Sequence, residues 1–124
     1  MELKKTYFFD TYAFFEIING NQNYMKYKGM QAATTRLNLM ELHYGLWKDY
    51  GKEFADQKYD EFLPICMEID DYTIKKANEF KLLHRKKNLS YIDCIGYIMA
   101  KIHGMAFLTG DRQLIAMENV EFVK

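Results

Sequence analysis

The sequence alternates between short apolar runs and longer amphipathic segments, and this alternation constrains the fold more than any other feature. Five runs have the length and the apolar or β-branched content of strands: 6–9, 33–37, 65–69, 105–108 and 120–123. A helical pattern follows each of the first four runs. Strands that alternate with helices form parallel sheets covered by helices, so the sequence predicts an α/β fold. We expect a three-layer α/β/α domain with a mostly parallel sheet of about five strands.

Seven segments have helical spacing: 12–18, 23–31, 39–50, 53–62, 71–86, 91–103 and 112–117. The pattern at 91–103 is the clearest, because its Ile and Met residues recur at intervals of three and four. Ser90 is suited to the N-cap of this helix and Gly104 to its C-terminal end. Pro64 predicts a break just before the third strand.

Composition excludes several classes of protein. With 124 residues, 49% of them hydrophobic, the chain is expected to form one domain with a sizeable core. No apolar run reaches the roughly 18–20 residues that span a bilayer, and the N-terminus does not resemble a signal peptide. Cys66 and Cys94 lie in apolar runs and outside any CxxC spacing, which favours buried thiols over a disulfide or a zinc site. Free thiols are typical of a reducing compartment, so we expect a cytoplasmic protein. The net charge of zero argues against bulk electrostatic binding to DNA or membranes.

Acidic residues mark the junctions between strands and helices. Four of them lie there: Asp10, Glu41, Asp93 and Asp111. Each has an ordinary structural explanation, because Asp10 and Asp111 can cap the helices that follow them. Asn38-x-x-Glu41 and Ser90-x-x-Asp93 have the form of capping boxes. Taken one at a time, these residues do not distinguish a helix cap from a functional site.

Taken together, the four acids favour a metal site. Helices that follow parallel strands begin at one edge of the sheet, where ligands bind in open α/β folds. Two carboxylates about 5 Å apart repel by roughly 3 kcal/mol at an effective dielectric constant near 20, so a cluster either holds protons or recruits cations. Oxygen ligands select Mg²⁺ or Mn²⁺ over zinc, and His43, His84 and His103 lie outside these junctions. Such ions can activate water for the hydrolysis of a phosphodiester bond.

The segments that carry these acids also resemble a known family. They are Asp10-Thr11, Glu41-Leu42 with Gly45, Leu89-Ser90-x-x-Asp93 and Thr109-Gly110-Asp111. In order and spacing they resemble the PIN domain, especially the small VapC-type ribonuclease toxins of prokaryotic toxin-antitoxin pairs. The resemblance covers nearly the whole chain and implies a single nuclease domain over residues 1–124. It further implies that the strand ending at Asp10 is central, with the 105–108 strand beside it.

The resemblance implies an endoribonuclease that uses Mg²⁺ or Mn²⁺, with the same four acids as metal ligands and catalytic residues. The hydroxyls of Thr11 and Thr109 are expected to orient a carboxylate or a bound water. Relatives imply a homodimer and a small antitoxin that blocks the cleft, without a role for membranes. An Arg or Lys of that antitoxin can neutralise the carboxylates, and we expect the segment 24–30 to form a wall of its binding groove.

Two departures from the family keep a second interpretation open. Gln113 stands where some relatives have a further acid, and the bulky Tyr97 follows Asp93 where relatives tend to have small residues. The alternative is a catalytically silent PIN-like binding module that acts through protein or RNA contacts. Six basic residues between 75 and 87 either form a solvated helix face or contact RNA phosphates. The sequence has no GxGxxG, GxxxxGK[ST] or HExxH motif, which argues against nucleotide-driven motors and zinc proteases.

Overall fold

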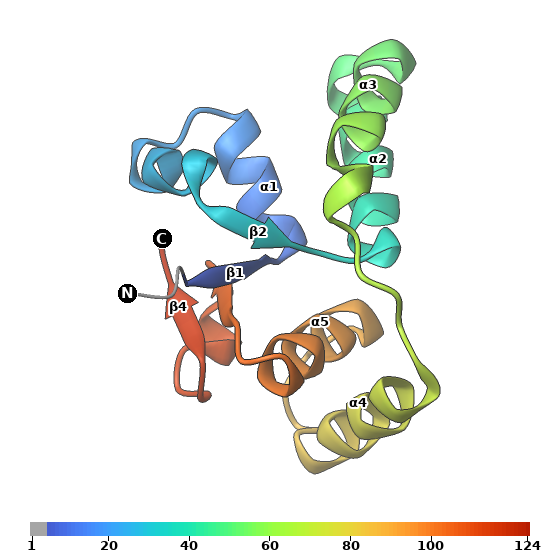
Figure 1. Ribbon diagram of the computed structural model, residues 1–124, viewed down its shortest axis with the longest axis vertical. Helices are drawn as coiled ribbons and strands as arrows, with labels where there is room; N and C mark the ends of the chain where they lie inside the picture. Colours follow the sequence, from blue (N-terminus) through green and yellow to red (C-terminus); the bar gives the residue numbers. More distant parts are fainter. Residues whose placement is uncertain (1–4) are drawn as a thin grey trace.

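A four-stranded parallel sheet forms the centre of the fold (Figure 1). The computed structural model describes residues 5–124. The strands are β1 (Thr6–Phe9), β2 (Gln31–Ala33), β3 (Ala106–Thr109) and β4 (Val120–Phe122). Their order is β2-β1-β3-β4, and Phe8 of β1 is aligned with Ala33 on one side and Phe107 on the other. The predicted parallel sheet is confirmed, with the strand that ends at Asp10 inside it and β3 beside that strand.

The prediction of a strand at 65–69 is wrong. Leu63–Ile65 form a short 3-10 turn, η2, and only an isolated bridge joins Cys66 to Thr34. The bridge does not extend because the chain turns into a helix immediately after Thr34, with Thr35 as the N-cap. The strand predicted at 33–37 is displaced for the same reason, since β2 ends at Ala33. The described sheet therefore has four strands rather than five.

The described part of the chain has five α-helices packed on the sheet: α1 (Thr11–Ile18), α2 (Arg36–Tyr50), α3 (Lys52–Phe62), α4 (Asp71–Leu83) and α5 (Tyr91–Ile102). The segments predicted to be helical at 23–31 and 112–117 are instead the 3-10 helices η1 (Gln22–Gly29) and η3 (Arg112–Leu114). Helices α1, α2 and α3 lie on one side of the sheet, and α4 and α5 lie on the other (Figure 1).

Alternating side chains of β1 face the two helical layers. Tyr7 and Phe9 pack into the cluster that contains α1 and α2, whereas Phe8 packs into the cluster that contains α4 and α5. Phe8 stacks on Phe107 of the neighbouring strand with 5.7 Å between ring centroids. This arrangement buries β1 on both faces and leaves only its carboxyl end, at Asp10, free to open toward a cavity. Within residues 5–124, no helix has the length and hydropathy that crossing a bilayer requires.

Candidate functional site

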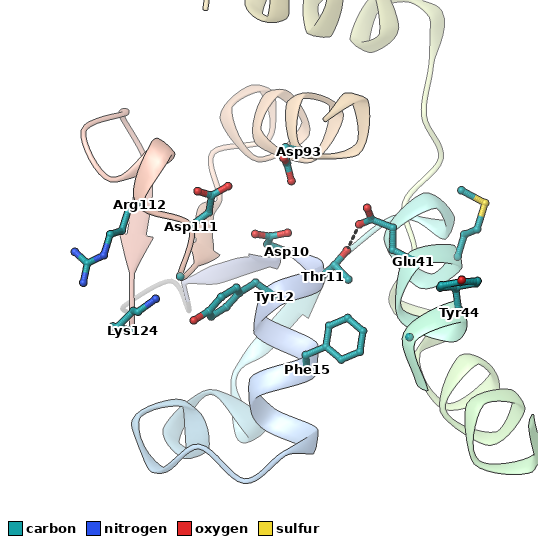
Figure 2. Close-up of a pocket in the computed structure, with 13 residues that line it drawn as sticks. Asp10, Thr11, Tyr12, Phe15, Glu41, Tyr44, Asp93, Asp111, Arg112 and Lys124 are labelled. Atoms are coloured by element: carbon teal, nitrogen blue, oxygen red, sulfur yellow. Dashed lines mark hydrogen bonds between the residues drawn. The ribbon is translucent and has the colours of Figure 1, made fainter. Parts of the chain in front are cut away.

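The four acidic residues surround one open cavity of about 860 Å³ at the carboxyl edge of the sheet (Figure 2). Asp10 lies between β1 and α1, Asp111 between β3 and η3, Asp93 in the first turn of α5, and Glu41 on α2. These positions come from elements that are far apart in the sequence. Aromatic and basic side chains also line the cavity: Tyr12, Phe15, Tyr44, Arg112 and Lys124.

Asp10 occupies the N-cap position of α1 but does not cap the helix, because its side chain makes no capping hydrogen bond. The side chain is only 4% exposed, and its Oδ2 accepts a hydrogen bond of 2.5 Å from the Thr109 hydroxyl. Burial raises the pKa of Asp10 to about 7; the Thr109 hydrogen bond lowers it, the charge of Asp93 raises it, and the backbone N–H groups of Thr11 and Tyr12 lower it. Burial of a carboxyl group is costly, and a pKa perturbed in this way is typical of a functional site.

Glu41 is held by Thr11, one of the two hydroxyls expected to orient a carboxylate, and Thr11 is held in turn by Asn38, for which no such role was expected. Helix α2 begins at Arg36 with Thr35 as its N-cap, so Asn38-x-x-Glu41 is not a capping box. The Thr11 hydroxyl donates to Glu41 Oε1 at 2.7 Å, and Asn38 Nδ2 donates to the same hydroxyl at 3.2 Å. Asn38 is buried and orients Thr11 through this contact. Thr is a favoured N-cap residue, so Thr35 was the signal in the sequence that could have predicted the true start of α2.

Asp93 both caps α5 and lines the cavity. Its Oδ2 accepts from the backbone N–H of Ser90 at 3.0 Å, and the Ser90 hydroxyl accepts from the backbone N–H of Asp93 at 3.0 Å. The capping box predicted here is therefore present. Burial raises the pKa of Asp93, the Ser90 hydrogen bonds lower it, Asp111 raises it and Lys81 lowers it. Lys81 also donates to the carbonyl of Leu89 at 2.5 Å, which holds the approach to α5.

Asp111 caps η3, and the same short segment supports α5. Asp111 Oδ1 accepts from the backbone N–H of Gln113 at 2.9 Å. The Gln113 side chain forms two hydrogen bonds with the backbone of Asn88, accepting from its N–H at 2.5 Å and donating to its carbonyl at 3.1 Å. Gln113 thus braces the loop that leads to Ser90 and Asp93.

Two further expectations about the cavity surroundings are changed. Tyr24 and Tyr27, in the segment 24–30 expected to form a partner groove, are buried in the core. The bulky Tyr97 packs against Phe80 on the α4 side, with 4.8 Å between ring centroids, and does not line the cavity. The site therefore does not have to accommodate the Tyr97 ring.

Gly110 allows one wall of the cavity to form. A Cβ at this position would lie 2.2 Å from Cε1 of Tyr12, so only a glycine lets the ring approach the backbone so closely. Figure 2 shows Tyr12 on the same side of the cavity as Arg112 and Lys124. The Lys124 ammonium lies 5.8 Å from the Tyr12 ring centroid, which is within the range of a cation–π contact.

The donor atoms of this site suit a hard divalent cation. All four acids offer carboxylate oxygens, and Asp10 is a buried carboxyl whose pKa rises in part because Asp93 carries the same charge. Among residues 5–124, no three His, Cys, Asp or Glu side chains are grouped tightly enough to hold a metal ion by themselves. Mg²⁺ is commonly bound through one or two carboxylates with water as the remaining ligands, so this spacing is compatible with it.

Comparisons with known proteins identify relatives of this fold. The family model for the PIN domain matches residues 7–120. Among solved structures, VapC20 of Mycobacterium tuberculosis, described as a Sarcin-Ricin loop cleaving toxin, matches at 16% identity, a TM-score of 0.78, and coverage of 94% of this chain and 96% of that chain. A toxin-antitoxin complex from Klebsiella pneumoniae matches at 16% identity and a TM-score of 0.74, covering 92% and 94%.

VapBC2 from Rickettsia felis, bound to a DNA fragment of its promoter, matches at 19% identity and a TM-score of 0.70, covering 95% of this chain and 97% of that chain. No curated protein sequence gives a significant match. At these identities the structural likeness establishes the fold.

Proposed function

Because the chain belongs to the PIN-domain family, we propose that it is a Mg²⁺- or Mn²⁺-dependent endoribonuclease and the toxin of a toxin-antitoxin pair. PIN domains are typically nucleases that use divalent metal ions. The observation that carries the proposal is the Asp10 carboxyl, which is buried at a helix start that it does not cap and borders a cavity with three other acids. Residues 1–124 form one nuclease domain in this proposal.

Asp10, Glu41, Asp93 and Asp111 would hold the metal ion, directly or through water. A bound divalent ion supplies an activated water and stabilises the leaving oxygen in phosphodiester hydrolysis. Thr109 holds Asp10, and Thr11 holds Glu41, through hydroxyl donors that keep each carboxylate oriented. The backbone N–H of Ser90 donates to one carboxylate oxygen of Asp93, which leaves the other oxygen for a ligand.

Arg112 and Lys124 are suited to bind the phosphates of the RNA. Both are exposed and line the same cavity as the acids, so they are available to the flanking phosphates of an RNA whose cleaved phosphate lies at the acids. The overall charge of zero makes this local pair more important than any long-range attraction.

A small antitoxin is the proposed partner, because the relatives include toxin-antitoxin complexes. A basic side chain of that partner would neutralise the four carboxylates and displace the ion, with inhibition as the direct result. Protein, partner and RNA would meet in the cytoplasm, and the toxin would be a homodimer there.

The first test is cleavage of labelled RNA by the purified protein with Mg²⁺, with Mn²⁺ and with EDTA. Asp93→Asn should abolish metal-dependent cleavage while it preserves the fold, because Asn can still cap α5. Asp71→Asn is the matched control, since Asp71 is also a first-turn Asp but lies exposed on α4. Cleavage that survives both EDTA and Asp93→Asn would reject the assignment.

A catalytically silent binding module is the second candidate. The commitment of Gln113 to Asn88 and the loose spacing of acids among residues 5–124 favour it. Titration with Mn²⁺ separates the two, because a silent module should give no binding heat and no rise in melting temperature.

The toxin assignment has its own test. Expression of the protein alone should slow growth, and co-expression of the neighbouring small reading frame should restore it. If growth is unaffected but the purified protein cleaves RNA in vitro, the toxin assignment is rejected and the nuclease assignment stands.

A further inference from the structure

One side of the cavity is lined by apolar side chains that have no part in the proposed metal site. Phe15 of α1 and Met40 and Tyr44 of α2 form it, and Tyr44 is 72% exposed although it borders the cavity. Figure 2 shows Phe15 and Tyr44 on the side of Glu41, opposite Arg112 and Lys124. An aromatic ring with this exposure adds little to the core, so its position at the rim is available for a ligand.

The Phe15 ring is fixed in place by close packing against α2. A Cβ at Gly45 would lie 2.4 Å from Cζ of Phe15, so the ring tip lies directly against the helix backbone. Tyr44 and Gly45 lie three and four residues after Glu41, which is one helical turn, or about 5 Å along the axis. The aromatic surface is therefore adjacent to an acid-bearing position of the site.

The cavity thus presents three kinds of surface in sequence: aromatic rings, carboxylates, and the cations Arg112 and Lys124. A single-stranded nucleic acid fits the rings and the cations, because each nucleotide joins a flat base to a negatively charged phosphate, and it fits the acids through the divalent ion of the proposed function. A protein segment would need an apolar, a basic and an acidic side chain at matching positions to fit the same three surfaces. This charge order favours a nucleotide chain as the occupant.

We propose that Tyr44 and Phe15 form a stacking subsite for an unpaired base of single-stranded RNA, next to the phosphate held at the acids. This inference rests on the proposed nuclease function and adds two substrate-binding residues to it. A base in a duplex has its faces covered by its neighbours, so the subsite accepts only bases that are unstacked, as in loops and single strands. Stacking is tolerant of sequence because every base has a flat face.

The experiment measures kcat/KM for a short single-stranded RNA whose cleaved bond has first been mapped with the unmodified protein. Tyr44→Ala should lower kcat/KM by roughly 5- to 150-fold, as the loss of one stacked base does. Tyr44→Phe should retain most of the activity because the ring remains. Tyr72→Ala is the matched control, since Tyr72 is 58% exposed on α4 and does not line this cavity.

The same RNA with an abasic ribose placed in turn on each side of the cleaved bond provides the second arm. At one position the missing base should lower kcat/KM of the unmodified protein by the factor seen for Tyr44→Ala, and Tyr44→Ala should then add no further loss. Equal losses by Tyr44→Ala on complete and abasic RNA would overturn the subsite, because the ring would then act without a base.

Other results separate this inference from the function on which it depends. If the unmodified protein cleaves no RNA, the nuclease proposal fails and the subsite fails with it. If it cleaves RNA and Tyr44→Ala behaves like Tyr72→Ala, the subsite alone is rejected. If Tyr44→Ala leaves cleavage intact but weakens binding of the co-expressed small protein, the aromatic surface binds protein and the inference is overturned.

Discussion

Replacing Asp10 by Asn should stabilise the fold, and the gain should increase with pH. Burial raises the pKa of Asp10 from 3.8 to about 7, so the folded protein holds a proton on this carboxyl that the unfolded chain has already released. Stability contributed by this group therefore falls as the pH rises from about 4 to about 7, because the unfolded state binds fewer protons than the folded state there.

The size of the effect follows from the pKa difference. One pKa unit corresponds to 1.36 kcal/mol, so the shift of Asp10 represents about 4 kcal/mol above about pH 8 and nothing below about pH 4. Asn carries no charge at any of these pH values, and its side-chain oxygen can still accept the hydrogen bond from Thr109. The variant should thus avoid most of the penalty at alkaline pH while it keeps the contact between β1 and β3.

Urea unfolding with EDTA present measures the difference, because the chelator prevents any metal ion from stabilising the ionised form. The free energy of unfolding of Asp10→Asn minus that of the unmodified protein should rise by about 1 kcal/mol per pH unit between about pH 4 and about pH 7, then level off. Asp71→Asn, which makes the same substitution at an exposed position on α4, is the matched control. A flat difference for Asp10→Asn would refute the reasoning.

Three further substitutions test the supports of the site. Gly110→Ala should cost about 1–3 kcal/mol through its clash with Tyr12, read as a lower urea midpoint, and an unchanged midpoint would mean that the ring moves away freely. Gln113→Ala should cost about 1 kcal/mol and speed deuterium exchange at the Asn88 amide, whereas unchanged exchange would contradict the brace. Ser90→Ala should cost about 1 kcal/mol in denaturant titration, with Ser90→Thr retaining most of the stability, and equal losses would argue against capping.

The parts of the fold that depend on local periodicity were predictable. The alternation of apolar runs and helices predicted the parallel sheet, and Ser90 with Asp93 predicted the start of α5, because a capping box is formed by residues three apart. The strand at 65–69 was wrong because strand formation requires a partner, and the chain leaves β2 at Thr34 before a second pairing can form. A sequence window contains no information about that partner.

The candidate site was only partly predictable for a similar reason. The four acids were visible at junctions, but the difference between Asp10, which caps nothing, and Asp111, which caps η3, depends on contacts with distant segments. The hydrogen bonds among Glu41, Thr11 and Asn38 join α1 to α2, so no periodic pattern within one helix predicts them. Gln113 looked like a missing ligand, whereas the structure gives its side chain a structural role.

The hydrogen bond between Thr109 and Asp10 joins residues that are 99 positions apart. Protein synthesis proceeds at about 5–20 residues per second, so about 5–20 s pass between the addition of Asp10 and that of Thr109. Until then β1 lacks its neighbour β3, and Asp111 does not yet exist to complete the set of acids. A nascent chain that has not yet reached Asp111 therefore cannot assemble this cavity, and whatever chemistry the site performs begins only after that residue has been added.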